Sequence, residues 1–240
     1  MWYIENVMKK LRFFTNKWLD KRMAEVFLDE NGGGIDFGKN IVKLHPALGS
    51  ARENHDSRKV VIREYFDEYY ASHKKDVLKD VANVEKGWRR VEENYSKITE
   101  NIFGGYNFPP GMYIAYASII NCNPRFLDSK TFQFFYKKGV GDAINTIAHE
   151  LLHFIFFDFV EKEMKNHINK LSSESLWDIS EIFNVIVLRS PIYREIVDRK
   201  YIVPYPNHRK YLKSFESAYM RSKNIKMFIK RGIDILSRQK

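Results

Sequence analysis

The stretch "DAINTIAHELLHFIFFDF", from Asp142 to Phe159, places two histidines and a glutamate in a segment that is otherwise almost entirely apolar. Its apolar residues recur at helical spacing, so we expect a helix that starts near Asp142, whose carboxylate favours a helix N-terminus. Burying imidazoles and a carboxylate without partners costs several kcal/mol. A core helix carries such groups only when something compensates for that cost, and a bound metal ion would do so.

The polar residues form the pattern H-E-x-x-H, with His149, Glu150 and His153. Residues four apart on a helix share one face with Cβ atoms about 5–6 Å apart, so both imidazoles can reach one Zn²⁺. Glu150 projects beside them, where it can take a proton from a water activated by the metal. The pattern predicts a zinc centre with Glu150 as general base. The structural alternative is a pair of hydrogen-bonded core histidines.

A catalytic zinc site has three protein ligands and one open position, so a third ligand is expected. The segment "LWDISEIFNVIVL" (176–188) predicts an apolar helix that nevertheless contains two carboxylates. Glu181 lies deeper in the apolar run and is the preferred ligand, with Asp178 as the alternative. The carboxylate that is not a ligand would orient a ligand histidine. Two further candidates are His167 and His208.

The segment "AHELLHFIFF", preceded by predicted strands and followed by a helix bearing Glu181, resembles the zincin metallopeptidases of the gluzincin type, whose third zinc ligand is a glutamate. The resemblance implies an α+β, zincin-like fold. Such a fold is mostly helical, with a small mixed or antiparallel sheet packed on a long helix and an active-site helix. It also implies Zn²⁺ held by His149, His153 and Glu181, and hydrolysis of peptide bonds in a peptide or protein substrate with Glu150 as general base.

By the same resemblance, "TFQFFYKK" (131–138) would be an edge strand that holds a substrate backbone in extended form. A donor to the tetrahedral oxyanion is usual in such sites. Tyrosines and a histidine that follow the third-ligand helix are candidates, although tyrosine-rich segments mostly pack. These residues are Tyr201, Tyr205, His208 and Tyr211.

The formal net charge of +10 lies entirely in the C-terminal region. Residues 189–240 contain 14 Lys/Arg and 4 Asp/Glu, whereas residues 1–188 contain 26 of each kind. A basic region of this kind can contact nucleic acid or an anionic surface weakly, or can be a solvated helical face. The alternative function is therefore a catalytically silent zincin-fold module that binds nucleic acid or a partner through this region. A helical interaction protein is a third hypothesis.

The length of 240 residues suits one good-sized domain with an extension. We expect an N-terminal helical or loop extension over 1–55 and a zincin-like domain over 56–240, with a basic helical region from about residue 189. The single cysteine, Cys122, excludes an intrachain disulfide and a cysteine-rich zinc site. The N-terminus lacks the pattern of a secretory signal, and the apolar runs are shorter than the about 20 residues that cross a bilayer. We expect a cytoplasmic protein without a transmembrane segment.

Apolar spacing predicts an amphipathic helix over residues 1–30. It also predicts a helix or helix pair over 59–103, with one continuous apolar seam from Val77 to Ile102. We favour packing of this seam across a sheet over a role in dimerisation.

β-branched and aromatic runs predict two strands, at "MYIAYASIINC" (112–122) and at 131–138. A further apolar helix is expected over about 173–188. The segment "NGGGIDFGKN" (31–40) is close to a phosphate-binding loop, but Asn40 replaces the Ser/Thr hydroxyl that holds magnesium. We therefore favour a flexible loop over a nucleotide site.

Overall fold

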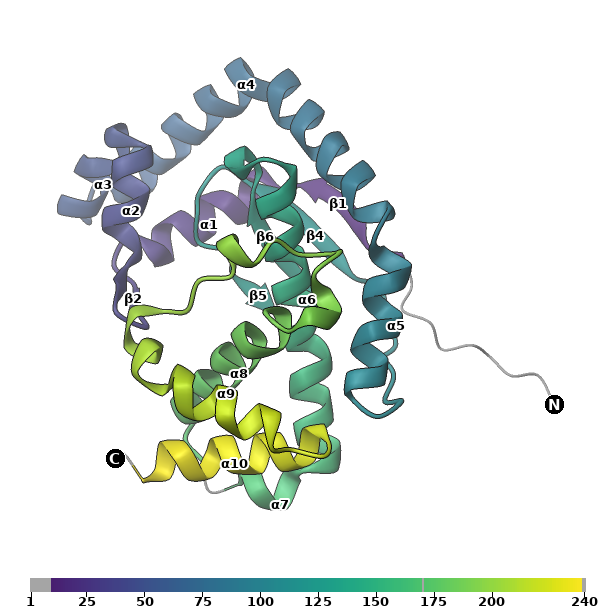
Figure 1. Ribbon diagram of the computed structural model, residues 1–240. Coiled ribbons are helices and arrows are strands. Elements are labelled where there is room, and N and C mark those ends of the chain that lie inside the picture. Colours follow the sequence, from purple (N-terminus) through teal and green to yellow (C-terminus); the bar gives the residue numbers. More distant parts are fainter. Residues whose placement is uncertain (1–9, 170, 239–240) are drawn as a thin grey trace. The chain divides into compact units, whose positions relative to one another are not determined.

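The computed structural model describes residues 10–169 and 171–238. The chain is an α+β protein, mostly helical, with a small mixed sheet (Figure 1). It divides into two compact units made of interleaved segments. The sheet unit contains residues 11–88 and 113–146, and the helical unit contains residues 89–112 and 147–238.

The sheet unit is built on four strands in the order β1-β4-β6-β5. β1, β4 and β6 are parallel, and β5 is antiparallel to β6. The inward-facing residues of the central strands, including Ala115, Ala117, Phe132 and Phe134, are buried. The strands are β1 (Arg12–Thr15), β4 (Ile114–Ser118), β5 (Arg125–Phe126) and β6 (Thr131–Phe135), and a separate hairpin is formed by β2 (Asn31–Gly32) and β3 (Ile35–Asp36).

The helices of the sheet unit lie before and between these strands. They are α1 (Lys17–Phe27), α2 (Phe37–Leu44), α3 (Gly49–Glu53) and α4 (Arg58–Arg89), with short 3₁₀ turns η1 (Pro46–Leu48) and η2 (Tyr136–Lys138). Residues on the two sides of the expected boundary at residue 56 contact each other. Arg58 donates to the Ala51 carbonyl and pairs with Asp29. His45 Nδ1 lies 2.6 Å from the Tyr65 hydroxyl. Residues 11–55 therefore pack within the same unit as the residues that follow them.

Both predicted strands are confirmed, as β4 and β6, but β6 is not an edge strand. β4 lies on one side of it, and on the other side β5 pairs with its first two residues. Beyond β5, the Gln133 N–H donates to the Pro124 carbonyl (2.8 Å) and the Phe135 N–H to Asn123 Oδ1 (3.2 Å). The prediction of an open substrate-holding edge at 131–138 is therefore wrong, because a two-residue strand and its flanking loop cover that side.

The N-terminal helix prediction is wrong over residues 12–15, which form β1, and its first nine residues lie outside the described part of the chain. The helix begins only at Lys17, after the Asn16 side chain accepts a hydrogen bond from the Leu19 N–H. Trp18, whose spacing would place it on the apolar face of such a helix, is 65% exposed. Parallel pairing with β4, about one hundred residues away, decides the conformation here rather than local spacing.

The glycine-rich segment 31–40 forms the β2–β3 hairpin and the start of α2 rather than a flexible loop. Asp36 caps α2 by accepting from the Lys39 N–H at 2.8 Å, and it receives two hydrogen bonds from Arg52. A Cβ at Gly38 would lie 1.9 Å from the Leu28 carbonyl oxygen. Glycine is required at 38 by close backbone packing, so the resemblance to a phosphate loop has a structural explanation.

The helix-pair alternative holds for 59–103: α4 is followed by α5 (Glu92–Ile102). Figure 1 draws α4 as a bent helix, and near its middle the Ser72 hydroxyl donates to the Glu68 carbonyl, a contact that often bends helices. The seam is buried through Val77 and Trp88, but in α5 the buried residues are Glu92, Tyr95, Ser96 and Thr99. The continuous seam is therefore wrong, because the chain turns between the two helices.

A fully buried carboxylate, that of Asp20, lies at the centre of the sheet unit. It accepts hydrogen bonds from the Tyr70 hydroxyl (2.7 Å), the Ile119 N–H (3.0 Å) and the Gln133 amide (2.5 Å). Burial raises its pKa to about 6, although the hydrogen bonds oppose that rise. The group joins α1, α4, the middle of β6 and the residue that follows β4, so its ionisation affects contacts between all four elements.

We expect this carboxyl to destabilise the protein as the pH rises. Its folded pKa lies above that of the unfolded chain, so its stabilising contribution is full below the unfolded value and is lost as the pH passes through 6. The loss is about 2 kcal/mol of unfolding free energy between about pH 4 and pH 7. Urea denaturation measures the unfolding free energy across this pH range. The decrease between the two pH values should be smaller by this amount in Asp20→Asn than in the wild type.

Asp67→Asn is the matched control for that measurement. Lys17 and Lys21 lower the pKa of Asp67 to about 2, so its folded-state carboxyl stays ionised over the same range. A pH dependence unchanged in Asp20→Asn, or reduced as much in Asp67→Asn, would contradict the assignment.

The helical unit contains α5, most of α6 (Val140–Glu163) and the elements that follow it. The predicted helix over 173–188 is confirmed as α8 (Ser173–Leu188), capped by the Ser172 side chain. α8, α9 and α10 pack together, with Phe228 against Phe183 and Phe215. The other elements are α7 (Lys165–Ile168), η3 (Pro191–Tyr193), η4 (Arg199–Tyr201), η5 (Pro206–Tyr211), α9 (Leu212–Met220) and α10 (Ile225–Ser237).

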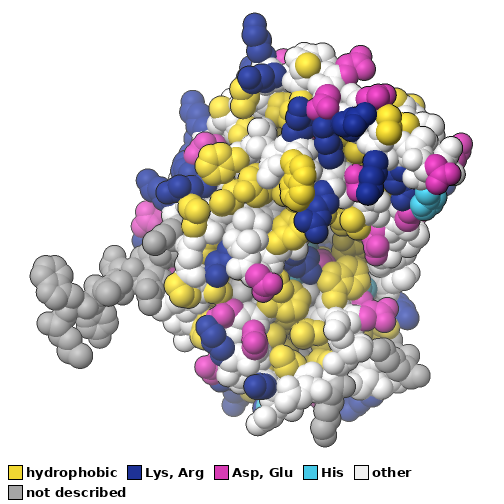
Figure 2. Space-filling view, turned by 180° about the vertical axis from the view of Figure 1, so that it is seen from behind, with side chains coloured by type: hydrophobic (Ala, Val, Ile, Leu, Met, Phe, Trp, Pro, Cys, Tyr) yellow, Lys and Arg dark blue, Asp and Glu magenta, His cyan; other side chains and the backbone are white. Residues whose placement is uncertain are grey.

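Helix α6 is the one described helix that is long and apolar enough, by length and composition, to cross a membrane. The apolar run at 151–160 is thus part of this longer helix, whereas the run at 112–120 contains strand β4. Its most apolar window is 78% buried inside the structure, and the core helix of a soluble protein passes the same test. On the face shown in Figure 2, exposed hydrophobic side chains lie between intermixed acidic and basic side chains.

Candidate metal centre

The H-E-x-x-H residues lie on α6, in the part that belongs to the helical unit. The helix begins at Val140, two residues before Asp142, which lies in its first turn instead of capping it. His153 is fully buried and Glu150 is 4% exposed, whereas the His149 side chain is 22% exposed. One imidazole thus opens toward solvent while the other is enclosed.

Glu181, on α8, meets both imidazoles. One of its carboxylate oxygens lies 3.0 Å from His149 Nε2, and the other lies 3.2 Å from His153 Nε2. The two Nε2 atoms are themselves 3.0 Å apart. Each Nε2 atom therefore lies beside one carboxylate oxygen and the other Nε2 atom, although a ring N–H can point at only one of them. The three side chains converge on a common point, which simple pairwise hydrogen bonding does not require.

These distances fit a small metal ion. Ligand atoms about 2 Å from a tetrahedral ion lie about 3.3 Å from one another, close to the separations of 3.0–3.2 Å between these side chains. Two imidazoles and a carboxylate are also a donor set that zinc accepts, with one position left open. Among the residues that the structure describes, His149, His153 and Glu181 form the one His/Cys/Asp/Glu group with geometry suited to a metal.

The charge of Glu181 also suits this arrangement. Burial alone would raise the pKa of its carboxyl, but the neighbouring His153 and His149 lower that pKa well below its ordinary value through charge and hydrogen bonding. The carboxylate is therefore ionised although only 3% of the residue is exposed. An ionised buried carboxylate beside two imidazoles is prepared to bind a cation.

Two buried side chains hold the ligand turn of α6 in place. Asn184, one turn after Glu181 on α8, donates to the carbonyl of His149 at 3.0 Å. The Tyr95 hydroxyl, from α5, donates to the carbonyl of Ala148 at 2.7 Å. Asn184 thus ties the two ligand helices together directly at the site. Neither residue was identified from the sequence, although Asp178, Glu181 and Asn184 recur every three residues and mark one polar face of α8.

The alternative third ligands lie elsewhere. Asp178 Oδ1 is 2.7 Å from Nε2 of the buried His208, so these two candidates pair with each other and not with the imidazoles. The carboxylate that is not a ligand is expected to orient a ligand histidine. That expectation is wrong, because Asp178 bonds His208 and not His149 or His153. His167 is exposed on the short helix α7.

The candidate oxyanion donors differ in their surroundings. Tyr205 packs against Trp177 and His208, and Tyr201 is 43% exposed with Lys200 over its ring. Tyr211 is half-buried, with Lys210 over its ring. His208 is bonded to Asp178, which precedes Glu181 by one helical turn on α8.

Comparison with known proteins adds no relative. No known protein family, no curated protein and no solved structure matches this chain.

Proposed function

We propose that this chain is a zinc-dependent peptidase. The observation that carries the proposal is the convergence of His149, His153 and Glu181 within 3.0–3.2 Å, with the H-E-x-x-H glutamate directly beside them in the sequence. The donor types and the open fourth position favour Zn²⁺. We further propose that its fold is zincin-like, of the gluzincin type, with the metal ligands on two neighbouring helices of an α+β chain.

The residues of the chain divide the chemistry between them. His149, His153 and Glu181 would hold the zinc ion, which when bound supplies Lewis acidity that lowers the pKa of water and polarises a carbonyl. Glu150 accepts a proton from the attacking water and returns it to the leaving amine. Asn184 and Tyr95 keep the ligand turn fixed through the carbonyls of His149 and Ala148.

Metal removal tests this proposal. The purified full chain is expected to carry about one zinc per molecule and to cleave an unstructured casein-like substrate. A chelator should abolish cleavage, and stoichiometric Zn²⁺ should restore it. Metal content is measured by elemental analysis alongside the activity. Absence of metal after gentle purification with no uptake from solution, or cleavage that survives complete chelation, would refute the proposal.

A further inference from the structure

The segment between α8 and α9, residues 189–211, carries more positive charge than the structure neutralises; we call it the connector. It contains six Lys/Arg and two Asp/Glu. Lys200 pairs with Asp198 at 2.9 Å, and Arg189 donates to the Ile202 carbonyl. Among the described residues, Arg194, Arg199 and Arg209 have no acidic side chain within ion-pair distance, and all three are exposed.

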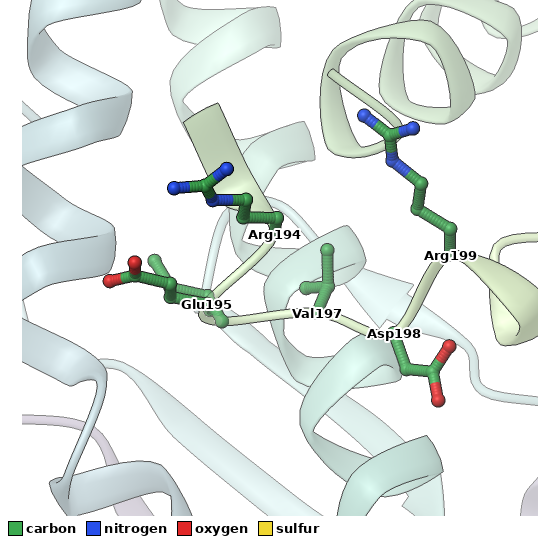
Figure 3. Close-up of a pocket in the computed structure, with 6 residues that line it drawn as sticks. Arg194, Glu195, Val197, Asp198 and Arg199 are labelled. Atoms are coloured by element: carbon green, nitrogen blue, oxygen red, sulfur yellow. The ribbon is translucent and has the colours of Figure 1, made fainter. Parts of the chain in front are cut away.

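Two of these arginines border an open hollow formed by residues 194–199. Figure 3 shows the guanidinium groups of Arg194 and Arg199 extending away from the Asp198 carboxylate, while the Glu195 carboxylate extends to the same side of the view as Arg194. Asp198 is already engaged by Lys200. Exposed, planar guanidinium groups are suited to bidentate contact with a carboxylate ligand.

The connector is fixed to the helix that bears Glu181. Its His208 is 2% exposed and bonds Asp178 at 2.7 Å. Trp177 packs on both His208 and Tyr205. The connector therefore leaves α8 at its end and returns to it one turn before the third-ligand position (Figure 1). The connector is therefore joined at both ends to the helix that carries the third-ligand residue.

The aromatic residues of the connector favour a peptide over a nucleic acid. Single-stranded nucleic acids stack bases on open aromatic faces along a strongly basic groove. Here Lys200 lies 4.6 Å from the Tyr201 ring centroid and Lys210 lies 4.8 Å from that of Tyr211. Tyr205 packs against its own chain. Within the connector, the exposed cations without acidic partners are Arg194, Arg199, Arg209 and Lys210, fewer than the about 6–10 phosphate contacts of a strongly salt-dependent nucleic-acid site.

We infer that the connector is a subsite for acidic side chains of a peptide substrate, with Arg194 and Arg199 as the contacting groups. This inference rests on the proposed peptidase function and adds a substrate class to it. Peptides with Asp or Glu near the cleaved bond would be bound in preference to neutral ones.

The test uses two labelled unstructured peptides that are identical except that one carries glutamates where the other carries glutamines. Binding to full-length Glu150→Gln protein is measured by fluorescence anisotropy, and cleavage by the wild type gives KM and kcat. We expect the glutamate peptide to bind about three- to tenfold more tightly, with the difference in KM and not in kcat. High salt should reduce the difference. In Arg194→Gln/Arg199→Gln the ratio of the two affinities should fall close to one.

The control is Lys223→Gln/Lys230→Gln, which removes the same charge from exposed positions outside the connector. It should keep the preference. Equal binding of both peptides by Glu150→Gln protein with both arginines intact would overturn the inference. An equal loss of the glutamate-peptide preference in the arginine and lysine double variants would also overturn it. Tighter retention of a single-stranded oligonucleotide than of the glutamate peptide, lost in the arginine variant, would also overturn it. If the preference is present but neither peptide is cleaved, the subsite stands and the peptidase proposal fails.

Discussion

Glu150→Gln is expected to reduce peptide hydrolysis by a factor of about 10²–10⁴ while leaving the zinc content unchanged. Glutamine has the size of glutamate but cannot accept and return a proton. Glu150 follows His149 on the same turn of α6 and is not one of the three converging side chains, so its replacement should leave the ligand set intact. The measurement is kcat/KM on an unstructured substrate, together with elemental analysis of the same preparation.

The matched control is Glu161→Gln, an exposed glutamate on the same helix. It should retain wild-type hydrolysis and wild-type zinc content. If Glu150→Gln cleaves as fast as the wild type, the general-base role is wrong. If it loses zinc as well as activity, Glu150 belongs to the metal-holding set and the division of roles proposed above must change.

Local patterns in the sequence predict well those elements whose burial is decided locally. The helix over 173–188 is confirmed at both ends, because an apolar run follows the capping residue Ser172. The strands β4 and β6 are confirmed for a similar reason, since β-branched and aromatic residues fill them between turn residues. The two-histidine spacing likewise predicts that His149 and His153 share a helix face, and their Nε2 atoms are 3.0 Å apart.

Features decided by distant parts of the chain could not be predicted. Residues 12–15 have helical spacing, but main-chain pairing with β4 makes them a strand. β5 has two residues, too few to show a period, yet it is what removes β6 from the edge of the sheet. The hydrogen bond from Asn184 to the His149 carbonyl depends on how α8 packs on α6, and a neutral amide in an apolar helix does not indicate its partner.

Of the remaining tests, replacement of Glu181 by glutamine should have the largest effect on metal binding. Loss of a residue that hydrogen-bonds a metal ligand typically costs about 10–100-fold in metal affinity, so loss of a direct ligand should cost at least about 100-fold. Asp178→Asn is the control on the same face of α8, because Asp178 bonds His208 at 2.7 Å and does not meet the imidazoles. Zinc affinity is measured by competition with a chromogenic chelator.

Asp178→Asn should bind zinc as the wild type does, whereas Glu181→Gln should not. Glu181→His separates loss of a ligand from loss of folding, since it restores a nitrogen donor and should recover part of the affinity if the position is a ligand. The carboxylate of Glu181 is buried between two imidazoles, so its replacement also changes the hydrogen-bonding partner of both. Circular dichroism of each variant shows whether the fold persists. Equal zinc loss in Glu181→Gln and Asp178→Asn, or unchanged binding in Glu181→Gln, would mean that the convergence of the three side chains is not a metal site.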